Sequence, residues 1–165
     1  MKIIRWICLL LVFVLGYQDL LAQKKTKEEK KQEMKEFVER SVKAHTFKID
    51  ASIAYPMRGR SISLTGSYSL ELKNDSADVY LPYYGRAYNI PYGGGKGLVF
   101  KAPVKDVITD FDKGKYTVTF STSNDEDTFD FVVKIYDGGS ANISVTMRNR
   151  TAISYSGSLD ATGLQ

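Results

Sequence analysis

The chain has 165 residues, 43% of them hydrophobic and 25% charged, which is an ordinary globular composition and fits one domain. Of its net charge of +4, three charges arise in residues 23–43, which carry eight basic and five acidic side chains, and one arises in residues 1–22, whereas residues 44–165 carry thirteen of each sign. Because the body of the protein is neutral, the composition argues against a nucleic-acid-binding face, which needs a basic patch on the folded domain.

Residues 1–22 have the three-part layout of a secretion signal. Lys2 and Arg5 form a short basic region, residues 6–16 are an unbroken apolar run, and Ala22 is a small residue at the expected cleavage point. The run of eleven residues is far shorter than the roughly 20 needed to span a bilayer, so a cleaved signal is favoured over an uncleaved anchor. Cys8 lies at the start of this run rather than after it, which argues against a lipid-modified cysteine. We expect a periplasmic or secreted protein that begins at Gln23 and contains no disulfide.

Residues 23–45 are predicted to form a charged amphipathic helix. They contain strong helix formers and no glycine or proline. Four apolar residues share one face at helical spacing, namely Met34, Phe37, Val38 and Val42. We expect this face to dock on the folded domain, and a helix lying on a membrane surface is the alternative.

Residues 46–165 are predicted to form a single antiparallel β domain, because apolar and polar residues alternate along most of this stretch. In the first strand the alternation places Phe47, Ile49, Ala51, Ile53 and Tyr55 on the inward face. The regular strands cover residues 47–55, 62–72, 77–83, 116–120, 129–135, 141–147 and 153–159. Two less regular strands, 98–101 and 105–112, are expected to join through Pro103, and short turns at 74–76, 123–127 and 137–139 indicate hairpins.

This pattern amounts to about eight or nine strands in up-and-down order. A sheet of that size must curl or fold over to bury its apolar face. We therefore expect a mainly β fold, an antiparallel meander that is curved or barrel-like, preceded by one N-terminal helix. A two-sheet sandwich is the alternative.

Residues 81–97 differ from the rest of the scaffold. They contain four tyrosines, five glycines and one arginine in a connection that is long for a compact domain. Tyrosine rings can stack on flat ligands or sugar faces, and an arginine can clamp a carboxylate or phosphate. The candidate ligand-binding residues are Tyr84, Arg86, Tyr88 and Tyr92. The alternative is a structural plug that closes the domain, with glycines supplying positive φ.

No catalytic or metal-binding residue is predicted. His45 is the only histidine and has no partner motif, so neither a hydrolase triad nor a histidine-based metal site is indicated. The acidic run 125–127 lacks the spacing of a calcium loop and fits a polar hairpin tip better. The glycines at 93–95 and 97 flank Lys96 but precede a strand-like segment, which excludes a phosphate-binding loop. No cofactor is expected.

Two blocks of the sequence, LPYYGRAYNIPYGGGKGLVF (residues 81–100) and NRTAISYSGSL (residues 149–159), follow a signal peptide and a charged helix. This arrangement resembles a family of small exported bacterial proteins, the domain of unknown function 4251, over nearly the whole mature chain. The resemblance implies a secreted single-domain protein. It implies no activity and no catalytic residues.

Three functions remain open at this point. The first is an exported, non-enzymatic binding module of the cell envelope, for a small or glycan-like ligand at the tyrosine- and glycine-rich loop. The second is a structural or protein-interaction component of the periplasm, with an envelope protein as its partner. The third is a carboxylate-based glycan hydrolase, which the lack of a recognisable acid/base pair makes the weakest.

Overall fold

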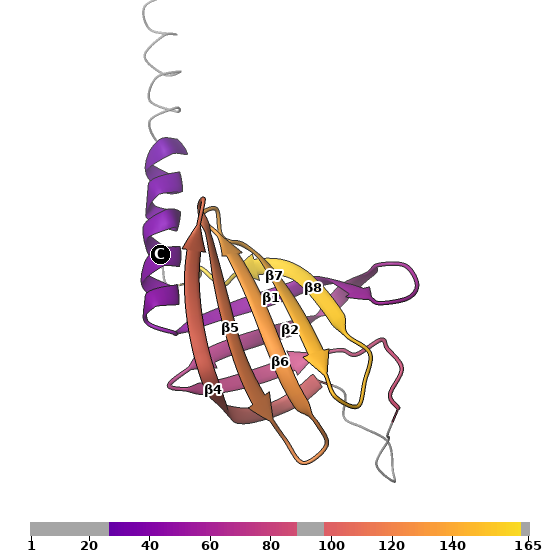
Figure 1. Ribbon diagram of the computed structural model, residues 1–165. Helices are drawn as coiled ribbons and strands as arrows, with labels where there is room; N and C mark the ends of the chain where they lie inside the picture. The colour runs from indigo at the N-terminus through magenta and orange to yellow at the C-terminus, as the bar shows by residue number, and fades with distance from the viewer. Residues whose placement is uncertain (1–26, 89–97, 163–165) are drawn as a thin grey trace, which may run out of the picture.

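The computed structural model describes residues 27–88 and 98–162. There, a helix over residues 27–43 precedes eight antiparallel strands that pair in sequence order and close into a barrel, because β8 pairs with β1 (Figure 1). The strands are β1 (Phe47–Pro56), β2 (Ile62–Lys73), β3 (Ser76–Leu81), β4 (Leu98–Asp112), β5 (Lys115–Ser123), β6 (Thr128–Tyr136), β7 (Ser140–Met147) and β8 (Ile153–Leu159). The barrel-like meander with one N-terminal helix is confirmed, and the sandwich alternative is wrong. The signal segment, residues 1–22, lies outside the described residues.

Large apolar side chains fill the interior of the barrel. Tyr155, Phe129 and Phe131 are among the largest side chains that are fully buried. Phe131 stacks on Phe120 of the neighbouring strand, with ring centroids 4.9 Å apart. An eight-stranded barrel is just wide enough for its inward side chains to fill it. The interior is therefore a packed core, and burial of this core holds the domain together.

A β-bulge in β1 makes the predicted phase of that strand wrong at its end. The ladders from β1 to β2 and from β1 to β8 both shift register between Ala51 and Ile53. Beyond the shift Ala54 is buried, whereas Tyr55, which was expected inside, is 44% exposed. A bulge inserts one extra residue and so reverses the alternation after it.

Strand β4 also differs from the prediction, because the two strands expected at 98–101 and 105–112 are one continuous strand. Pro103 pairs with Ser76, the first residue of β3, and so lies at the end of that ladder. A proline is tolerated there because its missing N–H costs no hydrogen bond within the ladder. The irregular phase arises from a bulge between Lys105 and Ile108, where Asp106 has a φ of 54°.

The N-terminal helix docks on the barrel as predicted. Val38 and Val42 are buried in the core cluster, and Met34 and Phe37 pack against it. The helix ends at Lys43, and the turn that follows it contains His45, which has a φ of 47° and whose Nε2 lies 3.2 Å from the Thr109 hydroxyl. Across the described residues, no helix combines the length and apolar character that crossing a membrane requires.

Candidate functional site

Four connections meet at the end of the barrel away from the helix. Successive connections of an up-and-down barrel alternate between its ends, so those joining β1–β2, β3–β4, β5–β6 and β7–β8 share one end. We call it the loop end, and its described residues are 57–61, 82–88, 124–127 and 148–152. Figure 1 shows the β1–β2, β3–β4 and β7–β8 connections on the side of the barrel opposite the helix.

Backbone hydrogen bonds fasten residues 82–88 to the β7–β8 connection. The Tyr88 N–H donates to the Asn149 carbonyl oxygen at 2.8 Å, and the Thr151 N–H donates to the Arg86 carbonyl oxygen at 2.9 Å. The described residues 86–88 of the first sequence block thus lie beside residues 149–151 of the second. The backbone beneath the candidate residues is held in place on both sides of Arg86.

The Tyr83 hydroxyl is the centre of this anchor. It lies 2.9 Å from the Thr151 carbonyl oxygen, 3.0 Å from the Arg86 carbonyl oxygen and 3.0 Å from the Thr151 hydroxyl. The Thr151 hydroxyl in turn accepts the Arg86 N–H at 3.1 Å. A Cβ atom at position 85 would overlap the Tyr83 hydroxyl. The bend at Gly85 therefore needs a residue without a side chain.

Replacing Tyr83 with phenylalanine is expected to lower the free energy of unfolding by about 1–2 kcal/mol, because removal of the hydroxyl leaves its hydrogen-bond partners unsatisfied. Urea denaturation measures this loss. Amide hydrogen exchange should also accelerate at Tyr88 and Thr151. The Tyr84→Phe variant is the matched control, because its side chain is exposed and it should unfold as the wild type does. Unchanged stability and exchange in Tyr83→Phe would show that the hydroxyl does not hold this segment.

A buried arginine supports the anchor from the β7–β8 connection. Arg150 is 5% exposed, and its Nη2 donates to the Glu126 carboxylate at 2.5 Å. Its guanidinium also lies 5.7 Å from the centre of the Tyr83 ring, within the range of a cation–π contact. Ala87 and Arg150 form an isolated antiparallel bridge. One side chain thus ties three of the four connections at the loop end together.

The acidic side chains of the β5–β6 connection also bind groups of the protein itself. The buried Asp127 carboxylate accepts the backbone N–H groups of Thr128, Arg148 and Asn149 at 2.8 to 3.2 Å. Asp127 and Glu126 lie at the polar hairpin tip, as expected, and they also join this tip to the β7–β8 connection. In the part of the chain that the structure describes, no group of three or more metal-ligating side chains is placed to hold a metal ion.

Tyr155 supports the start of the same segment from inside the barrel. Its hydroxyl donates to the Pro82 carbonyl oxygen at 2.8 Å. Burial raises the pKa of Tyr155 well above its usual range, and the neighbouring Tyr83 and Tyr84 hydroxyls raise that pKa further. Tyr155 therefore stays a neutral hydrogen-bond donor at physiological pH.

Above this anchor lies a pocket of about 420 Å³. Met57 and Arg58 line it from the β1–β2 connection, residues 84–86 and Tyr88 line it from the β3–β4 connection, and Thr151 completes it. Tyr84 is 41% exposed and Tyr88 is 73% exposed. We call it the loop-end pocket. Two tyrosines and two arginines line one depression there.

The structure brings together three of the four residues predicted to bind a ligand. Tyr84, Arg86 and Tyr88 all line the loop-end pocket, and Tyr92 lies outside the described residues. Met57 and Arg58 were not predicted. The up-and-down strand order could have indicated them, because it places the first and third connections at the same end of the barrel.

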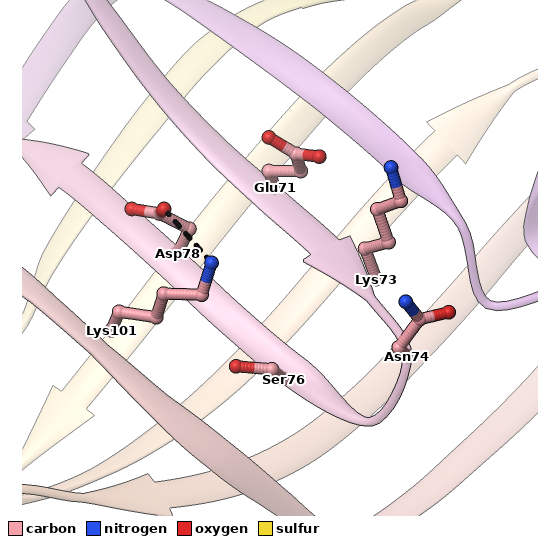
Figure 2. A pocket seen from close by; sticks show the side chains of 6 residues that line it. All are labelled: Glu71, Lys73, Asn74, Ser76, Asp78 and Lys101. Atoms are coloured by element: carbon pink, nitrogen blue, oxygen red, sulfur yellow. Dashed lines mark ion pairs between the residues drawn. The ribbon is translucent and has the colours of Figure 1, made fainter.

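A second depression, of about 340 Å³, lies on the outer face of β2, β3 and β4 (Figure 2). Its lining residues are Glu71, Lys73, Asn74, Ser76, Asp78 and Lys101. They point outward because the residues between them face the core. Lys101 pairs with Asp78 at 3.8 Å across two exposed side chains. Two lysines and two carboxylates compensate each other, so the depression offers no net charge to a ligand.

Comparison with known proteins supports the fold and identifies the family. The chain is similar to a crystal structure of a DUF4251 family protein from Bacteroides eggerthii DSM 20697, with a TM-score of 0.59 and 20% sequence identity over 76% of this chain and 86% of that chain. No protein of curated function matches it significantly. The family profile described as "Domain of unknown function (DUF4251)" matches residues 25–159. The chain therefore belongs to the DUF4251 family.

Proposed function

We propose that this protein is an exported, non-enzymatic binding module of the cell envelope that takes a small, glycan-like ligand in the loop-end pocket. The observation that carries the proposal is the pair of exposed rings of Tyr84 and Tyr88 on a backbone that hydrogen bonds hold in place. The export part of the proposal rests on the signal pattern of residues 1–22.

A fixed platform of exposed tyrosines suits sugar recognition. The ring faces offer apolar surface to the C–H face of a pyranose, and the phenolic hydroxyls can exchange hydrogen bonds with its substituents. Because hydrogen bonds already fix the backbone that carries the two rings, ligand binding costs little backbone conformational entropy. Pockets of this kind combine aromatic walls with a few polar groups that orient the ligand.

The filled interior favours a second candidate. Tyr155, Phe129 and Phe131 fill the core, so a ligand would have to bind at the mouth of the barrel rather than inside it. A structural or protein-interaction component of the periplasm needs no internal cavity and is the alternative. The hydrolase hypothesis has less support, because none of the described residues that line the loop-end pocket carries a carboxylate.

Alanine at both Tyr84 and Tyr88 is expected to weaken saccharide binding about fivefold or more while the fold is kept. Each lost stacking contact removes roughly 0.5–1.5 kcal/mol of binding free energy, and exposed side chains contribute within about 0.5 kcal/mol to stability. A glycan array identifies the saccharide that the wild type binds, and isothermal titration calorimetry measures the variants. Tyr136→Ala, at the far end of β6, is the matched control and should bind as the wild type does.

Thermal melts distinguish a ligand-binding role of these residues from a structural role in closing the domain. The Tyr88→Ala and Arg86→Ala variants should melt within a few degrees of the wild type if these side chains serve a ligand. A loss of about 1 kcal/mol or more in both variants would favour the structural plug instead, because buried polar groups would have lost their partners.

A further inference from the structure

The arginines of this chain are gathered at one end of the barrel. Five of the seven arginines in the sequence lie in the connections of the loop end, at positions 58, 60, 86, 148 and 150. Within the eight strands that the structure describes, every basic residue is a lysine. Arginine differs from lysine in presenting a rigid planar fork of donors that matches an oxyanion.

Two of these arginines line the loop-end pocket. Arg58 and Arg86 are exposed, and neither guanidinium makes an ion pair or a side-chain hydrogen bond with the described residues. The neighbouring charged groups of the anchor already have partners. Arg150 is paired with Glu126, and Asp127 accepts backbone N–H groups. Among the described residues, the two pocket arginines therefore have no acidic partner.

From this arrangement we infer that the ligand of the loop-end pocket is an anionic saccharide, and that Arg58 and Arg86 bind its oxyanion while Tyr84 and Tyr88 contact the sugar face. The inference rests on the proposed binding function. Beyond that function, the inference specifies that the ligand is negatively charged. It also assigns a binding role to Arg58, which lies in the β1–β2 connection, far in sequence from Tyr84 and Tyr88. An oxyanion held by the two guanidiniums would gain charge-assisted hydrogen bonds.

The anionic group can be a carboxylate, a sulfate or a phosphate, since the arginine fork suits all three. Matched probe pairs distinguish them. An oligogalacturonide is compared with its fully methyl-esterified form, a sulfated galactan oligosaccharide with its desulfated form, and mannose 6-phosphate with mannose. Each pair keeps the sugar and removes the negative charge, by esterifying the carboxylate or by taking away the sulfate or phosphate group.

Isothermal titration calorimetry of the purified protein with these probes tests the inference. We expect the charged member of at least one pair to bind tenfold or more tightly than its neutral partner, with an affinity that falls as salt is raised. The variants Arg58→Gln and Arg86→Gln should each lose tenfold or more in affinity for that probe. Arg60→Gln, on the same connection as Arg58 but outside the pocket lining, should keep it.

Three results would overturn the inference. If the neutral members bind as well as the charged ones, and only the tyrosine variants lose binding, the proposed function stands and the anionic assignment fails. If Arg60→Gln loses as much affinity as Arg58→Gln, binding reflects a diffuse positive surface rather than the pocket. If no probe binds the wild type, both the anionic assignment and the glycan-binding proposal fall. Melting curves confirm that each variant is folded.

Discussion

Phe131→Ala is expected to lower the free energy of unfolding by about 3–5 kcal/mol. Phe131 is 1% exposed and lies in the middle of β6, where it faces Val145 of β7 and stacks on Phe120 of β5. Truncation removes this buried aromatic surface and leaves a cavity that neighbouring strands cannot close, because their positions are set by the barrel ladders. Urea denaturation followed by circular dichroism measures the loss as a lower midpoint.

Val132→Ala is the control for this substitution. Val132 is the next residue along β6 and is only partly buried, on the opposite face of the strand. Its truncation should cost far less than that of Phe131. A Phe131→Ala midpoint equal to that of the wild type would mean that the core is not packed around this side chain.

Gly157→Ala is expected to destabilise the protein by more than about 3 kcal/mol, or to prevent folding, because overpacking against backbone cannot be relieved by a change of rotamer. Gly157 lies on β8 opposite Ala51 of β1, in the pair that closes the barrel. A Cβ atom there would collide with the Asp50 carbonyl oxygen and crowd the Ala51 Cα. The two strands would have to separate, which breaks the closing ladder. Soluble yield and the thermal melt report the outcome.

Gly138→Ala is the matched control, because its added Cβ would meet nothing within 4 Å. It lies in the β6–β7 turn and has no positive φ, so it should melt close to the wild type. A native melt for Gly157→Ala would show that β1 and β8 approach less closely than the ladder indicates.

Local patterns identified most of the strands and their inward faces. The alternation of Phe129, Phe131, Val133 and Ile135 predicted one buried face, and all four side chains are buried. This succeeds because side chains of an extended chain alternate whatever its partners are. The prediction failed at Tyr55 and Pro103, where bulges or ladder ends decide the outcome. Those features depend on the partner strand, which the local sequence does not specify.

The candidate site was only partly predictable. Tyr84, Arg86 and Tyr88 stood out because an aromatic and glycine-rich connection is unusual in any scaffold. Arg58 and the Arg150–Glu126 pair did not stand out, because a single basic turn or an acidic hairpin tip is ordinary by itself. Their importance depends on which connections share one end of the barrel.

By itself the sequence determined the antiparallel β class, the N-terminal helix, the inward residues of regular strands and the segment that carries three pocket residues. These properties depend on periods of two or about 3.6 residues and on local composition, which involve only near neighbours in the chain. Closure of β1 on β8, and the contact between residues 82–88 and the β7–β8 connection, were decided by the tertiary structure alone. Such contacts join residues far apart in sequence, and they form because a sheet of eight strands must bury one face and pair both of its edges.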